Sequence, residues 1–254
     1  MSQNDTPTPA KKSCGRNIAK ILSTLLFLTF LTLCGMIAFN LYETYKTNAL
    51  SQQMNEIRRI SEKETPEDWS RGMLEVNPDY VGWLNVIGTE INGPVVQGED
   101  NNEYLRRDIH GEYSVAGTFF LDEKVDLSIE DGNVMIYGHL MNDETMFGPL
   151  KHYKDSEFFQ ENNLIRWETQ AGTSYYRIFA AMIVSGYADT ERYLNLQSWM
   201  NTISEETEQE MLSQIQEASF IFQENMFRSG PYIFLVTCDY GINNGRLVLV
   251  GEKI

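Results

Sequence analysis

The most continuous hydrophobic stretch of the chain lies near its start. Residues 21–39 contain no charged side chain, and Leu41 and Tyr42 extend the run as far as Glu43. At about 1.5 Å per residue, a helix of this length spans a hydrocarbon core of roughly 30 Å. The pattern therefore predicts a transmembrane segment over residues 21–42.

A periodic pattern follows over residues 43–64, which are mostly polar. Their apolar positions recur at spacings of four, three and three, namely Leu50, Met54, Ile57 and Ile60. This spacing places one apolar stripe on a helix, so we expect the helix to lie on the surface of a folded domain. Pro66 is expected to break or restart it.

From Tyr80 onward the chain changes to short apolar and β-branched runs that are separated by turn residues. The runs are 81–86, 91–96, 117–121, 133–137, 164–168, 175–184, 232–237 and 247–251. About eight short strands with glycine-rich turns predict a mainly-β fold, a closed or nearly closed barrel. Two helices interrupt the strands, over residues 147–160 and roughly 196–218. The second is a long helical insertion between late strands.

Charge divides the chain in the same place as hydropathy. Residues 1–40 hold four of the 20 basic residues (Lys11, Lys12, Arg16 and Lys20) and one of the 36 acidic residues, so the remainder has a net charge of −19. The basic flank predicts a cytoplasmic N-terminus and an exported C-terminal part. The acidic remainder argues against nucleic acid binding, which needs a basic surface.

We therefore expect a single-pass protein of the cell membrane with an extracellular domain. The predicted parts are a cytoplasmic basic tail (1–20), a transmembrane signal anchor (21–42), a helical linker (43–67) and an extracellular domain (68–254). A cleaved signal peptide is the alternative, but the apolar run is longer than a typical signal core. Residues 31–34 also resemble a lipoprotein cleavage box, although Leu33 is bulkier than the residue expected before the cysteine.

Cys238 is the single cysteine beyond the predicted anchor, since Cys14 precedes the anchor and Cys34 lies within it. Exported domains normally pair their cysteines, so an unpaired thiol indicates that the sulfur is used. A buried, inert cysteine is the alternative. His139 ends the run 134–137 as Cys238 ends the run 232–237, and strand ends can hold side chains together at a barrel rim. We predict that these two residues pair as nucleophile and acid/base. His110, like His152, is expected at the surface.

Arg246 is the third candidate, because Asn244-Gly245 predicts a tight hairpin that returns the chain to the neighbourhood of Cys238. Its guanidinium is suited to hold an oxyanion. The alternative is a surface arginine on an edge strand. No metal or cofactor is predicted, because one thiol and a distant histidine lack the spacing of a zinc site and no glycine-rich phosphate loop occurs.

These motifs together resemble the sortase family, whose pattern Thr-Leu-x-Thr-Cys matches residues 234–238 except that Phe234 replaces the first threonine. The resemblance covers essentially residues 68–254. Three segments are similar to class B, namely 101–109, 113–120 and 146–150. The resemblance implies a closed eight-stranded barrel with an N-terminal helix.

The resemblance also implies a cysteine transpeptidase anchored in a Gram-positive membrane. Cys238 would attack the threonine carbonyl of a C-terminal sorting motif on a surface protein, giving a thioacyl enzyme. His139 would transfer protons, and Arg246 would hold the oxyanion or the motif backbone. The acceptor would be an amine of the peptidoglycan cross-bridge or of a pilin. Thr237 would shape the oxyanion site.

Two further positions, Asn101 and Leu105, match residues that line the class B substrate groove. Val236 and Leu140 depart from the serine and asparagine common in class B, which concerns the recognised motif more than the reaction. Two alternatives remain at this point. One is an L,D-transpeptidase, although its histidine lies close to its cysteine rather than 99 residues upstream. The other is a non-catalytic anchored β-domain that binds a wall component.

Overall fold

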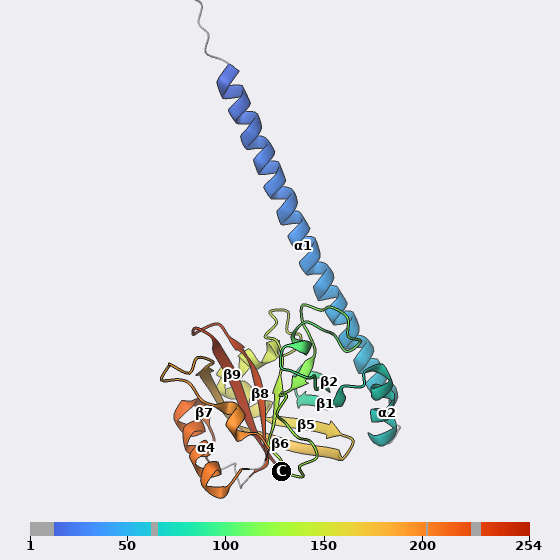
Figure 1. The fold of residues 1–254 in the computed structure, drawn as a ribbon, viewed down its shortest axis with the longest axis vertical. Helices are drawn as coiled ribbons and strands as arrows, with labels where there is room; N and C mark the ends of the chain where they lie inside the picture. Colours follow the sequence, from blue (N-terminus) through green and yellow to red (C-terminus); the bar gives the residue numbers. More distant parts are fainter. Residues whose placement is uncertain (1–12, 62–65, 202, 225–229) are drawn as a thin grey trace, which may run out of the picture. The chain divides into compact units, whose positions relative to one another are not determined.

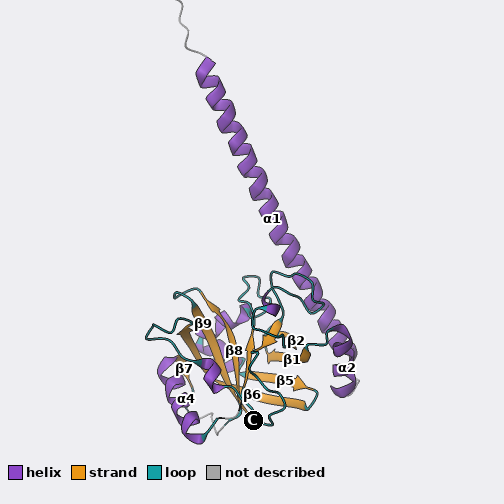
Figure 2. Cartoon of the chain, viewed as in Figure 1, coloured by secondary structure: helices purple, strands orange, loops and turns teal. Residues whose placement is uncertain are grey.

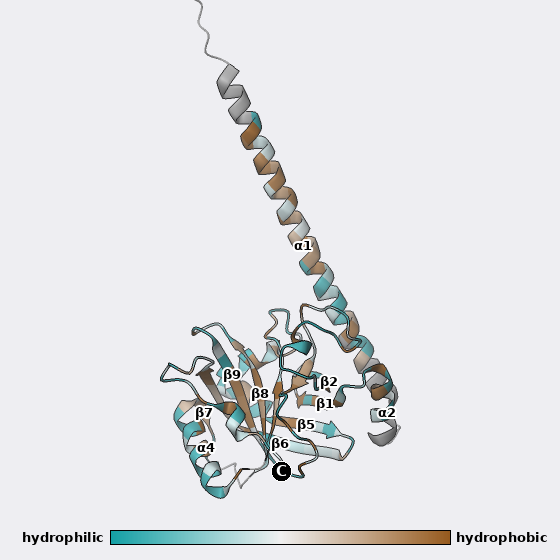
Figure 3. Ribbon diagram, viewed as in Figure 1, coloured by the Kyte–Doolittle hydropathy of each residue, from teal (hydrophilic) through white to brown (hydrophobic). Residues whose placement is uncertain are grey.

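The computed structural model describes residues 13–61, 66–201, 203–224 and 230–254. Two compact units divide the chain, Met1–Lys46 and Thr47–Ile254. Helix α1 (Ser13–Ser61) contains the apolar run, shown in brown in Figure 3. Within the described residues, its segment Lys20–Met54 is the one helix that is long and apolar enough to cross a membrane. Most of the predicted basic tail, residues 1–12, lies outside the described residues.

The second unit is a β-barrel (Figure 2). Its strands are β1 (Tyr80–Ile87), β2 (Asn92–Val96), β3 (Phe119–Leu121), β4 (Val134–Tyr137), β5 (Leu164–Thr169), β6 (Gly172–Ser185), β7 (Ser219–Phe222), β8 (Tyr232–Asp239) and β9 (Gly245–Lys253). The order is β5-β1-β2-β3-β4-β8-β9-β6-β7, and β5 also pairs with β6. This last pairing closes a barrel of eight strands, which confirms the predicted fold.

Strand β7 is a strand that the hydropathy pattern did not predict. It pairs with β6 outside the closed ring, with Ala180 opposite Phe222 and Met182 opposite Ser219. It has four residues and follows a helix directly, without the turn residues that mark the other strands. So short a run cannot be identified as a strand from its sequence, and its pairing with β6 defines it.

Both predicted helical interruptions are present, but each consists of two elements. Residues 147–160 form a 3₁₀ helix η2 (Gly148–Lys154) and a helix α3 (Ser156–Glu161). Asp155 separates them, because its backbone is extended and its carboxylate accepts hydrogen bonds from two amides at the start of α3. The prediction of a single helix over residues 147–160 was therefore wrong.

The insertion between β6 and β8 differs from the prediction in the same way. It contains a 3₁₀ helix η3 (Leu196–Trp199) and a helix α4 (Glu205–Ala218), which is capped by the Ser204 hydroxyl. Asn201, with a φ of 61°, interrupts the helical path between them. Helix α4 packs against β6 and β7, as Figure 1 shows, and Met211 and Ile215 are buried in the main core.

Two hydrophobic cores hold this unit together. The larger core draws on all the strands of the barrel and on η2, α3 and α4. The smaller one lies where α1 and α2 (Pro66–Val76) meet the first strands, with Met54, Met73 and Trp83 buried. Leu50 packs against it, so this part of the predicted stripe is confirmed. The side chains of Ile57 and Ile60 lie outside the described residues.

Candidate active site

Three adjacent strands bring the predicted catalytic residues into one row. Strands β4 and β8 are parallel with Tyr137 opposite Val236, so His139 and Cys238 occupy equivalent positions two residues further along. Strands β8 and β9 are antiparallel, and Cys238 lies directly opposite Arg246. Neighbouring strands are about 4.8 Å apart. The row His139–Cys238–Arg246 therefore crosses β4, β8 and β9 at one level.

Hydrogen bonds extend the register of β4 and β8 beyond the last paired residues. The Gly138 amide donates to the Val236 carbonyl at 3.3 Å, and the Thr237 hydroxyl donates to the Gly138 carbonyl at 2.8 Å. Figure 1 shows the β8–β9 turn (red) and the loops that follow β2 and β4 at the same end of the barrel. The row lies at this end, where loops can reach a bound peptide.

Cys238 has a free thiol of intermediate exposure, at a position where β8 leaves the core. The preceding six residues of the strand are all buried, whereas Cys238 is not. The alternative of a buried, inert cysteine does not fit this exposure. The next residue, Asp239, is buried, and its carboxylate accepts hydrogen bonds from Lys154 Nζ at 2.6 Å and from the Gly241 amide at 2.8 Å.

His139 is held by the backbone of the loop that follows β2. Its Nε2 lies 2.8 Å from the carbonyl oxygen of Leu105, in the 3₁₀ helix η1 (Glu103–Leu105). A carbonyl oxygen only accepts, so Nε2 carries its proton in this arrangement and Nδ1 is left as the basic nitrogen. Burial lowers the pKa of His139, and the nearby charge of Arg106 lowers it further, whereas the bond to Leu105 opposes them. The resting imidazole is therefore neutral at neutral pH.

Arg246 belongs to a central strand, because β9 lies between β8 and β6. The alternative of a surface arginine on an edge strand is therefore wrong. The side chain is half-buried, and its Nη1 donates to the carbonyl of Gly245 at 2.9 Å. This bond keeps the guanidinium close to the β8–β9 turn and across from Cys238.

The predicted groove residues are in the same region but use their polar groups internally. The Asn101 amide donates to Asp122 Oδ2 at 3.1 Å, and its carbonyl accepts from the Glu123 amide at 2.9 Å. Leu105 acts on His139 through its backbone carbonyl, while its side chain packs on the smaller core. Thr237 is buried, and its hydroxyl joins β8 to β4.

Four other residues shape the site and were missed by sequence reasoning: Tyr137, Asp122, Arg106 and Lys154. Tyr137 could have been found from the sequence, because it is the last residue of its strand and precedes His139 by two residues. The other three are brought to the site by contacts between distant segments. No local sequence pattern marks such contacts.

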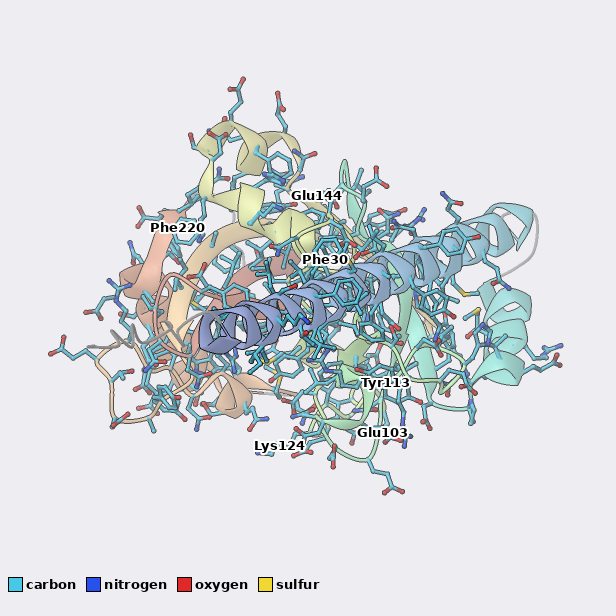
Figure 4. The ribbon with its side chains drawn as sticks, turned by 90° about the horizontal axis from the view of Figure 1, so that it is seen from above. Phe30, Glu103, Tyr113, Lys124, Glu144 and Phe220 are labelled. Atoms are coloured by element: carbon cyan, nitrogen blue, oxygen red, sulfur yellow. The ribbon has the colours of Figure 1, made fainter. Side chains whose placement is uncertain are left out.

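The remaining histidines are at the surface, as predicted. His110 is exposed in a turn, where its amide donates to the Asp108 carboxylate. His152 is exposed and lies 3.1 Å from Glu144. Figure 4 shows Glu144 next to η2 and α3 and on the opposite side of the view from Lys124 and Glu103. Neither histidine belongs to the row of His139 and Cys238.

Comparison with known proteins agrees with this geometry. A sequence model of the sortase domain matches residues 84–254, which is well over half of the chain. The chain belongs to the sortase family. It is 31% identical to sortase B of Listeria monocytogenes over 191 residues, which is 74% of each protein. It is 29% identical to sortase B of Staphylococcus aureus over 185 residues, or 71% of this chain and 72% of that protein.

The structural comparison points to the same class. The crystal structure of sortase B from Bacillus anthracis in complex with AAEK1 is similar, with a TM-score of 0.69 and 29% identity. The match covers 84% of this chain and 98% of that structure. The chain is therefore a class B sortase and a cysteine transpeptidase. This assignment replaces the L,D-transpeptidase and the non-catalytic wall-binding domain as alternatives.

Proposed function

We propose that this class B sortase cleaves a C-terminal sorting motif after its threonine and transfers the protein to an amine. The observation that carries the proposal is the row of His139, Cys238 and Arg246 across β4, β8 and β9. The row supplies a thiol, an imidazole and a fixed positive charge at one end of a rigid barrel. Acyl transfer through a thioester needs a nucleophile, an acid/base and a group that stabilises the oxyanion, and these three side chains can serve those roles.

The reaction begins with transfer of the Cys238 proton to His139, which gives a thiolate and an imidazolium. The thiolate sulfur bonds to the threonine carbonyl carbon, and Arg246 stabilises the oxyanion that forms. The carbon–nitrogen bond to the next residue then breaks, and the leaving amine takes the proton from His139. This sequence leaves a thioacyl enzyme and a neutral imidazole.

The second half of the reaction uses the same groups in the reverse direction. A neutral amine attacks the thioester carbon and loses a proton to His139, while the carbon–sulfur bond breaks and restores the thiolate. The low pKa of His139 favours this step, because the neutral imidazole is available as a base. The amine belongs to a peptidoglycan cross-bridge or to a pilin lysine, which are the two acceptor classes of the family.

Residues 21–42 are proposed to anchor the enzyme in the membrane, with residues 1–20 in the cytoplasm and residues 68–254 outside. The length and apolar composition of the first unit support this topology. The four basic residues that precede the run support the orientation. Residues 43–67 then connect the anchor to the catalytic domain. In this arrangement the enzyme meets surface proteins as they leave the membrane.

A ligation assay tests the reaction. The full chain in detergent micelles is mixed with peptides of the Asn-Pro-x-Thr-Asn and Leu-Pro-x-Thr-Gly types and with cross-bridge or lysine-containing acceptor peptides. Mass spectrometry should show a thioacyl adduct on Cys238 and a ligated product. Arg246→Ala should retain the adduct site but react about 10²–10³ times more slowly. Equal product from the wild type and Cys238→Ala would show that the proposal is wrong.

A further inference from the structure

Asp122 is a fully buried carboxylate immediately after β3. Its Oδ2 accepts three hydrogen bonds, from Asn101 Nδ2 at 3.1 Å, Tyr137 Oη at 2.8 Å and Gln197 Nε2 at 2.7 Å. Its Oδ1 accepts a fourth, from the Lys124 amide at 2.9 Å. A charge removed from water is costly unless donors surround it, and four donors do so here.

The donors come from segments that are far apart in the sequence. Asn101 lies in the connection after β2, Tyr137 ends β4, and Gln197 lies in η3 of the insertion. The Gln197 amide is held at both ends, because its Oε1 also accepts from Lys124 Nζ at 3.0 Å. Asp122 thereby joins the loop after β2 and the insertion to the strand that leads to His139.

Tyr137 connects this carboxylate with the catalytic row. It lies two residues before His139 and opposite Val236, which in turn lies two residues before Cys238. Burial and the Asp122 charge raise the pKa of Tyr137 far above its ordinary value, whereas Gln197 and the charge of Arg246 oppose them. The phenol therefore keeps its proton and donates a hydrogen bond to Asp122, with Arg246 close enough for its charge to act on the ring.

We propose that Asp122 is a positioning residue for the transpeptidation: it fixes the Tyr137 hydroxyl and the Gln197 amide beside the His139–Cys238–Arg246 row. The bound peptide then contacts a side of the site whose polar groups are already in place. Asp122 acts through Tyr137 and Gln197 and does not touch the reacting atoms. The inference rests on the proposed function, because it assigns one wall of the same site.

Replacement by asparagine tests the carboxylate at nearly constant volume. In Asp122→Asn, an NH₂ group replaces one of the two carboxylate oxygens. Because both oxygens accept hydrogen bonds in the wild type, this NH₂ group must face another donor. We expect the kcat/KM for acylation by the sorting-motif peptide to fall about tenfold, the usual scale for a hydrogen bond to a charged group. Asp126→Asn is the matched control, since Asp126 is exposed on the same connection. It should react as the wild type does.

Alkylation of Cys238 by iodoacetamide separates positioning from general damage. This small reagent needs no groove, so its rate with Asp122→Asn should equal the wild-type rate while peptide acylation falls. All rates are expressed per folded molecule, with the folded fraction measured by circular dichroism. A purely structural role would lower the folded fraction or change both rates together.

A double-mutant cycle with Tyr137→Phe decides whether Asp122 acts through the phenol. Tyr137→Phe removes a single oxygen and should itself slow acylation, so it tests the inference even where Asp122→Asn fails to fold. The double variant should be no slower than Asp122→Asn alone, because Tyr137 contributes only through its bond to Asp122. Acylation at the wild-type rate in Tyr137→Phe, or additive losses, would overturn the inference. If the wild type forms no thioacyl adduct, the proposed function is wrong and the inference about Asp122 is wrong as well.

Discussion

His139 shows how single residues set the chemistry of this enzyme. Its imidazole is half-buried and lies near the charge of Arg106, and both features disfavour the protonated form. The contact with the Leu105 carbonyl favours protonation but does not outweigh them. In the proposed reaction, the proton that His139 takes from Cys238 is therefore held weakly and is easily passed to a leaving amine.

Removing the Arg106 charge should raise the pKa of His139, because protonation would no longer place two positive charges close together. The change is Arg106→Met, and NMR titration of the His139 ring protons, assigned with His139→Gln, measures the shift. Arg107→Met is the matched control, since Arg107 is exposed and pairs with Glu103 at 2.7 Å. An unchanged or lower His139 pKa in Arg106→Met would contradict the electrostatic explanation.

Strands β4 and β8 show how elements carry the site. Their parallel pairing places His139 and Cys238 side by side although 99 residues separate them in the sequence. The end of this pairing depends on Gly138, the residue between Tyr137 and His139. An added Cβ there would lie 2.8 Å from the ring of Phe147 and 2.9 Å from that of Phe119. Only glycine allows these rings to pack against the strand end.

We therefore expect Gly138→Ala to lower the free energy of unfolding by about 1–3 kcal/mol, the usual cost of overpacking. It should also slow acylation, because His139 is the next residue. Gly72→Ala is the matched control. Gly72 lies in α2 with no atom near its added Cβ, so that change should stabilise the domain by about 0.5–1 kcal/mol. Denaturant unfolding of both variants measures the difference, and equal effects would argue against the close packing at Gly138.

At the scale of the whole molecule, the chain consists of an apolar helical unit followed by an acidic barrel unit. The first unit contains the apolar run, and the second contains every strand among the described residues. The net charge of −19 beyond residue 40 favours solubility and disfavours adhesion to anionic lipid surfaces. The one strongly basic region is the N-terminal flank, on the side of the anchor proposed to be cytoplasmic.

The three cysteines provide a test of this topology. In intact cells, a thiol reagent that does not cross membranes should label Cys238 but not Cys14, because the anchor separates them. Cys34 should stay unlabelled within the bilayer. Permeabilised cells should show labelling at Cys14 as well, and the mass of the purified protein should include residues 1–42. A chain shortened at its N-terminus would instead support cleavage of a signal peptide.

The sequence alone was sufficient for the eight barrel strands and the apolar run, and it supplied His139, Cys238 and Arg246 as the proposed catalytic residues. These features follow from local patterns, namely apolar periodicity, strand ends and the Asn244-Gly245 turn. Local patterns failed where a neighbour decides the structure. Strand β7 exists because β6 pairs with it, and two predicted helices divide at Asp155 and near Asn201 because capping and backbone conformation interrupt them.

Only the tertiary structure showed how the site is held. The parallel register of β4 and β8 brings His139 beside Cys238, and the bond to Leu105 selects the tautomer of the imidazole. Folding also buries Asp122 among donors from three distant segments. A sequence pattern records which side chains are present. Long-range pairing and burial decide which of them meet and which protons they hold.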